Sequence, residues 1–169
     1  MALYELEVED LDALQAVSDE HMRRIEADEM HRSPPETIDR DNVRSMYFAE
    51  TGPRLGGHDD VSETLFMPFT EPVSEEDDEE FNRWYQEVHL PEVLDVPGFS
   101  AASRYKETGM NMTGRPWPIN FPYLALYELG DGTKEAFDNA MKELRRRISE
   151  GDQMEISETV GADKITKVY

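Results

Sequence analysis

Apolar positions along the chain follow two different periods, which predict strands and helices in turn. In LALYEL (124–129) Leu124 and Leu126 fall on one side and Tyr127 on the other, the alternation of a half-buried strand. DGT (131–133) then supplies a turn and an N-cap, and Gly151 is predicted to end the helix that follows. Within that helix the apolar residues recur at helical spacing and form one stripe, namely Phe137, Ala140, Met141, Leu144 and Ile148.

The same plan occurs a second time, at the front of the chain. Residues 2–25 align without a gap on residues 125–148, and both stretches contain ALYEL and end in RRI. Two unrelated amphipathic helices share apolar positions but rarely an unbroken pentapeptide, so we interpret the match as an internal duplication. Each helix leads to a further predicted strand. The corresponding stripe of the front helix is Leu11, Leu14, Val17, His21 and Ile25.

The middle of the chain adds strands over 63–69 and 99–107, with a helix between them that begins at Ser74. Pro68 indicates that the first of these strands is an edge strand or carries a bulge. Pro91 is expected to perturb the helix, and VPG (96–98) to end it. The apolar and aromatic face of this helix consists of Phe81, Trp84, Tyr85 and Val88.

The order of these elements predicts an α+β fold built from ferredoxin-like repeats. Residues 61–169 follow the order β-α-β-β-α-β, whereas the front of the chain has only β-α-β. We therefore expect a partial repeat over 1–52, a Gly-rich linker over 53–60 and a complete repeat over 61–169.

The amino-acid composition excludes several classes of binding partner and of catalytic chemistry. The net charge of −21 argues against nucleic acid and anionic membrane surfaces, which require clustered Lys and Arg. The absence of cysteine excludes disulfides, thiolate catalysis and Cys-ligated metals. The N-terminus has no basic region followed by an apolar run, and no segment has the length of a spanning helix, so we expect a cytoplasmic protein.

One pair of side chains on the middle helix suits proton transfer. Tyr85 and His89 are four residues apart, so they lie on one helix face. An imidazole beside a phenol is a workable general acid–base pair, although the spacing alone is more often that of a structural histidine bonded to its neighbour. The four histidines are scattered without metal-ligand spacing, and we predict no metal site.

The segment 81–105 contains an aromatic-x-x-x-His-x-Pro helix end, a PGF turn and a strand that ends in Arg-Tyr. The residues of this pattern are Trp84, Tyr85, His89, Pro91, Pro97, Gly98, Phe99, Arg104 and Tyr105. With this pattern the segment resembles the EthD-like family of the dimeric α/β-barrel (ferredoxin-like) superfamily. The resemblance implies a homodimer in which antiparallel sheets face one another and a pocket lies between sheet and helices.

The resemblance also implies a function. We expect a cofactor-independent isomerase, dehydratase (lyase) or cyclase that acts on a small apolar metabolite, such as an aromatic compound or a lactone. His89 and Tyr85 are the expected catalytic residues. The alternatives are a non-catalytic protein that binds a hydrophobic metabolite and a cofactor-free monooxygenase of the same superfamily. The candidate substrate-binding residues are Trp84, Arg104, Tyr105, Trp117 and Phe121.

Two of these assignments stay open at the level of sequence. Arg104 and Tyr105 are adjacent in a strand and point to opposite faces, so at most one of them faces the pocket. Residues 107–122 suit either a loop over an apolar ligand or packing between subunits. Tyr4 and Tyr127, which are equivalent in the repeat, are predicted to be packing or edge residues.

The expected homodimer is tested by the mass of the protein in solution. Sedimentation equilibrium should give twice the chain mass of 19.5 kDa, because a half repeat leaves part of an apolar sheet face without a cover. A mass of one chain across the micromolar range would contradict the predicted dimer.

Overall fold

The computed structural model defines the chain in several stretches. By contacts, the chain divides into two compact units, one of Met1–Phe48 and Glu107–Asn120 and the other of Ala49–Lys106 and Phe121–Tyr169. The described residues are 3–30, 44–57, 64–110, 121–151, 154, 157–160 and 165–168.

Four strands form the centre of an antiparallel sheet. β5 (Tyr123–Leu129) lies between β4 (Phe99–Glu107) and β3 (Thr64–Thr70), and β6 (Ile165–Val168) pairs with the other side of β3. Two short strands, β1 (Phe48–Glu50) and β2 (Leu55–Gly56), extend the sheet beside β4. The order β4-β5-β3-β6 is compatible with the predicted ferredoxin-like α+β fold.

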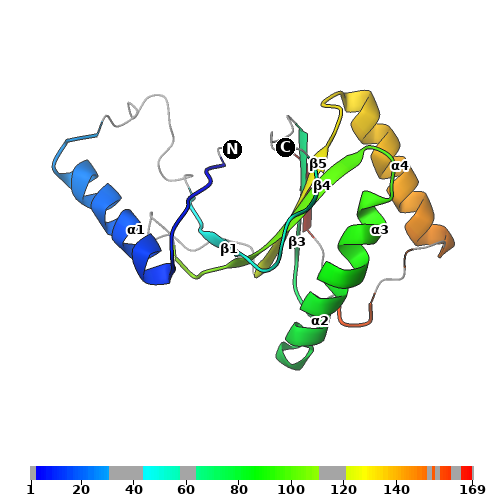
Figure 1. Cartoon of the computed structure of the whole chain (residues 1–169), viewed down its shortest axis with the longest axis horizontal. Helices are drawn as coiled ribbons and strands as arrows, with labels where there is room; N and C mark the ends of the chain where they lie inside the picture. Colours follow the sequence, from blue (N-terminus) through cyan, green and yellow to red (C-terminus); the bar gives the residue numbers. More distant parts are fainter. Residues whose placement is uncertain are drawn as a thin grey trace. The chain divides into compact units, whose positions relative to one another are not determined.

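The helices of the second unit lie on one face of this sheet (Figure 1). A 3₁₀ turn, η2 (Glu75–Asp77), begins after Ser74, as predicted, and leads into α2 (Asp78–Trp84). A π-helical turn, η3 (Tyr85–His89), joins α2 to α3 (Leu90–Leu94). Within the described part of the chain, no helix combines the length and apolarity that a membrane span requires.

α4 (Lys134–Glu150) confirms the helix predicted after DGT. Its N-cap is Thr133, whose hydroxyl accepts a hydrogen bond from the Ala136 amide at 3.2 Å. At the other end Gly151 adopts a left-handed conformation with φ of 64°.

The core of the second unit lies between these helices and the sheet. Aromatic rings of adjacent strands stack there: the Phe66 and Tyr127 centroids are 5.8 Å apart, and Tyr127 also meets Phe99 edge-on at 5.7 Å. Helix residues close over them, since Phe81 and Leu90 are completely buried. The helices are thus held on the sheet by apolar burial, the dominant favourable term in folding.

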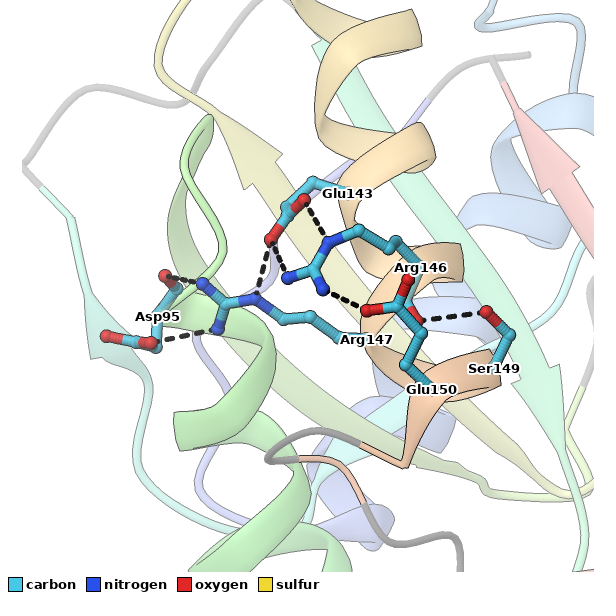
Figure 2. Close-up of polar contacts among 6 residues, drawn as sticks. All are labelled: Asp95, Glu143, Arg146, Arg147, Ser149 and Glu150. Atoms are coloured by element: carbon cyan, nitrogen blue, oxygen red, sulfur yellow. Dashed lines mark hydrogen bonds and ion pairs between the residues drawn. The ribbon is translucent and has the colours of Figure 1, made fainter.

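Ion pairs fix the end of α4 against the end of α3 (Figure 2). Arg147 donates to the Asp95 carboxylate at 2.9 Å and to the Asp95 carbonyl at 3.3 Å. Arg147 and Arg146 both bind Glu143, and Arg146 also bonds Glu150. The side chain of Arg147 is only 13% exposed, so it is less screened than an ordinary surface pair. Two helices that flank the pocket described below are thereby tied together.

The front ALYEL copy does not form the strand that the duplication predicts. α1 (Leu11–Glu26) is present and is capped by Asp10, but residues 3–8 have no strand structure. Tyr4 is 82% exposed, whereas its counterpart Tyr127 is 1% exposed in β5. The reason is that a strand is stabilised by its neighbours: β5 has a partner on each side, and residues 3–8 have none.

Three smaller predictions are also wrong. β3 is not an edge strand, because β5 and β6 flank it, and its register passes Pro68 without a shift. Val88 is 37% exposed because the π turn rotates it away from the core. In the stripe of α1, Leu11 and Val17 are 53% and 43% exposed, and only Leu14 is buried.

Gly98 makes a close approach that can be tested by substitution. Its φ is +108°, and a Cβ added there would lie 3.0 Å from the Cβ of Ala140 in α4. We expect Gly98→Ala to lower the free energy of unfolding by about 3 kcal/mol, from backbone strain and overpacking together.

Gly151→Ala is the matched control, because Gly151 also has a positive φ (+64°) but an added Cβ would meet nothing within 4 Å. It should lower the free energy of unfolding by about 1 kcal/mol, measured for both variants by urea denaturation. Equal losses for the two variants would show that the contact with α4 is unimportant.

Candidate functional site

A cavity of about 130 Å³ lies over β3, between the η3–α3 segment and α4. Polar groups enter it from both sides: Thr70 and Tyr127 from the sheet, and Tyr85 and His89 from η3. The rest of its wall is apolar and consists of Phe66, Pro68, Trp84, Val93, Leu144, Ile148 and Val160.

The π turn η3 brings the aromatic residues of the site together. The amide of Leu90 donates to the carbonyl of Tyr85, five residues back, and Pro91 has no amide with which to resume the α-helical pattern at the next position. The half-buried ring of His89 therefore stacks on Trp84, with centroids 4.8 Å apart and planes 22° apart. It also meets the ring of Tyr85 edge-on at 4.8 Å.

Three buried hydroxyl groups line the cavity, those of Thr70 and Tyr127 from the sheet and that of Tyr85 from η3. Thr70, Tyr85 and Tyr127 are 4%, 3% and 1% exposed. Among the described residues, the hydroxyls of Thr70 and Tyr127 make no hydrogen bond of normal geometry, although both lie close enough to the hydroxyl of Tyr85 to lower the pKa of that phenol. Unpartnered buried hydroxyls are costly and are uncommon in folded proteins.

These surroundings keep both phenols protonated at neutral pH. Burial raises the pKa of Tyr85, and the charge of Arg104 and the hydroxyls of Tyr127 and Thr70 only partly offset this rise. Burial, followed by the proximity of Tyr85, raises the pKa of Tyr127 well above its usual range. Both side chains are therefore available as hydrogen-bond donors.

Behind Tyr85 lies a buried cation. The guanidinium carbon of Arg104 is 3.8 Å from the centroid of the Tyr85 ring, and the rings of Phe81 and Tyr123 lie 4.6 and 4.7 Å from it. Arg104 is 1% exposed and donates from Nη1 to Asn82 at 2.9 Å. Its Nε and Nη2 have no partner among the described residues.

A polar network holds Asn82 in place for this contact. Asn82 donates to the hydroxyl of Tyr123 at 2.8 Å, and that hydroxyl donates to Asp78 at 2.7 Å. Burial lowers the pKa of Arg104 to about 10, and interactions with the surrounding tyrosines and Asp78 partly oppose this effect. At neutral pH Arg104 is thus a buried cation, and no carboxylate of the described residues bonds to it directly.

The structure brings together only part of the residue set proposed from sequence. Trp84, Tyr85 and His89 line one cavity, and Arg104 contacts the ring of Tyr85 from outside it. Tyr105 follows Arg104 in the part of β4 whose register with β5 is continuous, from Ala101 to Lys106, and therefore points to the opposite face. Phe121 is 8% exposed and does not line the cavity, and Trp117 lies outside the described residues.

Sequence reasoning overlooked Thr70 and treated Tyr127 as a packing or edge residue. One signal was available, since Phe66, Pro68 and Thr70 alternate in β3 and must share a face. The face on which Tyr127 lies follows only from the register of β3 with β5, in which Phe66 lies opposite Tyr127 and Thr70 lies opposite Tyr123.

No family model, curated protein or solved structure matches this chain. The resemblance to the EthD-like family therefore depends on the residues quoted above and on the order of the elements. In the part of the chain that the structure describes, no three His, Asp or Glu side chains are grouped so that they could hold a metal ion.

The unpaired charge of Arg104 leads to a stability prediction. We expect Arg104→Met to be as stable as the wild type at neutral pH or up to about 2 kcal/mol more stable, because an apolar chain of similar length avoids the burial of a charge. In chemical denaturation, the free energy of unfolding of the wild type should rise relative to that of the variant as the pH rises above about 10. The reason is that Arg104 loses its proton at a lower pH in the folded protein than in the unfolded chain.

Arg83→Met is the control, because Arg83 is an exposed arginine on α2, beside Asn82, and pairs with Glu80 and Glu87. It should change stability by less than about 1 kcal/mol, without that dependence on pH. A loss of several kcal/mol in Arg104→Met would instead assign Arg104 to the structural core.

Proposed function

We propose that the second unit is a cofactor-independent acid–base enzyme that moves a proton on a small, largely apolar metabolite. The proposal covers isomerase, dehydratase (lyase) and cyclase reactions, all of which can be catalysed by a positioned proton donor and acceptor. His89 is the proton-transferring group, and Tyr85 orients an oxygen of the substrate. The proposal remains tied to this site and not to the fold, since one fold supports many activities.

The observation that carries the proposal is the contact of His89 with Tyr85 at the wall of a cavity that is otherwise mostly apolar. A half-buried imidazole can reach both a bound molecule and solvent, which a proton carrier needs. Stacking on Trp84 fixes the plane of the imidazole, so its nitrogen atoms point in defined directions.

The same cavity favours an enzyme over a protein that only binds an apolar metabolite. A simple binding site would need few polar groups near His89, but Tyr85 contacts it directly and Thr70 and Tyr127 add two more hydroxyls. Polar groups that have no partner in the folded protein are characteristic of sites that complete their hydrogen bonds with a ligand.

Proton exchange tests this function without knowledge of the natural substrate. The wild-type protein is incubated in D₂O with a panel of one-ring or smaller compounds that carry an acidic C–H bond: ketones, lactones and nitroalkanes. We expect accelerated exchange of deuterium into at least one class, detected by NMR. His89→Gln should slow this exchange by about 100-fold, the usual contribution of a general base.

His21→Gln is the matched control, because His21 is also half-buried but lies on α1 in the other unit. It should leave the exchange rate unchanged. The proposal fails if no class exchanges faster than in buffer, or if His89→Gln exchanges as fast as the wild type.

A further inference from the structure

We propose that Thr70, Tyr85 and Tyr127 together form a binding site for a carbonyl oxygen, and that the substrate is a one-ring ketone or lactone that passes through an enolate. The inference deepens the function proposed above and depends on it for the role of His89. It assigns ligand contacts to two residues of the sheet, Thr70 and Tyr127.

The first ground is the set of unsatisfied hydroxyls. Thr70 comes from β3, Tyr127 from β5 and Tyr85 from η3, and all three line the same cavity. The hydroxyls of Thr70 and Tyr127 are buried and have no partner within the described part of the chain. A ligand oxygen with two or three lone pairs would satisfy them at once, whereas an apolar ligand would leave them unpaired.

The second ground is charge. The guanidinium of Arg104 lies 3.8 Å from the Tyr85 ring centroid, and it is a buried cation with two unpartnered donor atoms among the described residues. A cation in this position favours negative charge on a neighbouring oxygen, in a medium where screening is weak. The chain as a whole carries a net charge of −21 and repels anions, so any preference for an anion must arise locally.

The third ground is size. A dry apolar cavity of roughly 150 Å³ in another protein binds benzene, so about 130 Å³ is suited to a single ring. Phe66, Trp84 and Leu144 supply the apolar wall for such a ring. The oxygen of the ring compound would then lie at the sheet side, where the hydroxyls are.

The chemical step requires no other reactant. His89 takes a proton from the carbon next to the carbonyl group, and the electron pair of that C–H bond forms a C=C bond. The π pair of the carbonyl moves to the oxygen, which accepts hydrogen bonds from the three hydroxyls. The imidazolium then returns the proton to the α-carbon, and an oxygen pair reforms the C=O bond. In a substrate with a C=C bond conjugated to the enolate, the dienolate can instead take the proton at its γ-carbon, which shifts the C=C bond and isomerises the substrate.

Two probes of nearly the same shape test the oxygen site independently of turnover. 4-Nitrophenol carries a hydroxyl that can ionise, and 4-nitrotoluene carries a methyl group in the same place. We expect the wild type to bind 4-nitrophenol at least tenfold more tightly by calorimetry, and bound 4-nitrophenol to show more of the yellow anion than it does in buffer of the same pH. Tyr127→Phe and Thr70→Val should each weaken 4-nitrophenol binding about tenfold and leave 4-nitrotoluene unchanged.

Tyr105→Phe is the matched control, because Tyr105 points away from the helix-covered face of the sheet. It should bind both probes like the wild type. Thermal unfolding adds a second readout: Tyr127→Phe should melt at a higher temperature, since it removes an unpartnered buried hydroxyl and keeps the ring stacked on Phe66.

Equal affinity for the two probes, or an equal loss of both in Tyr127→Phe, would overturn the inference. If the oxygen preference is absent while exchange in D₂O still depends on His89, the acid–base function stands and only the carbonyl site is wrong. If the preference is present and no exchange occurs, the oxygen site stands and the protein binds its ligand without catalysis.

Discussion

The pairing of β5 with both β3 and β4 is the constraint on which the second unit depends. It buries every residue of β5 and sets Tyr127 opposite Phe66 on one side and Ala102 on the other. The helices pack on the aromatic cluster formed in this way, and Tyr85 and His89 belong to this helical segment. The front copy of the same pentapeptide has no strand on either side and forms none. Identical local sequence therefore gives a strand only where neighbours complete it.

The site reduces the stability that the core supplies. Within the described part of the chain, the interior holds a cation without a carboxylate contact and two hydroxyls without a partner, where apolar side chains of equal size are expected to be more stable. Such local conflicts with good packing are expected at functional positions and are otherwise rare. The π turn has the same character, because it interrupts a helix at the segment that presents Tyr85 and His89 to the cavity.

Much of the second unit could be predicted from periodicity. The strand over 99–107, the capped helix α4 and the order of elements all follow from local pattern, and the spacing of Tyr85 and His89 correctly predicted that their side chains lie together. The sheet half was not accessible in this way, because Thr70 and Tyr127 are more than fifty positions apart in the chain and reach the same cavity only through the pairing of β3 with β5. The prediction from Pro68 was wrong for a related reason. A proline favours an edge strand, but pairing with strands on both sides stabilises β3 by more than the one hydrogen bond that the proline cannot donate.

The most direct test of the account is the carbon resonance of a bound carbonyl group. Cyclohexanone labelled with ¹³C at the carbonyl would be added to the wild-type protein and to Tyr127→Phe. The account predicts a bound resonance downfield of its position in water, as strong hydrogen bonds polarise the carbonyl group, and a return toward that position in the variant. A bound resonance at the upfield position typical of apolar solvents, unchanged by the substitution, would contradict it.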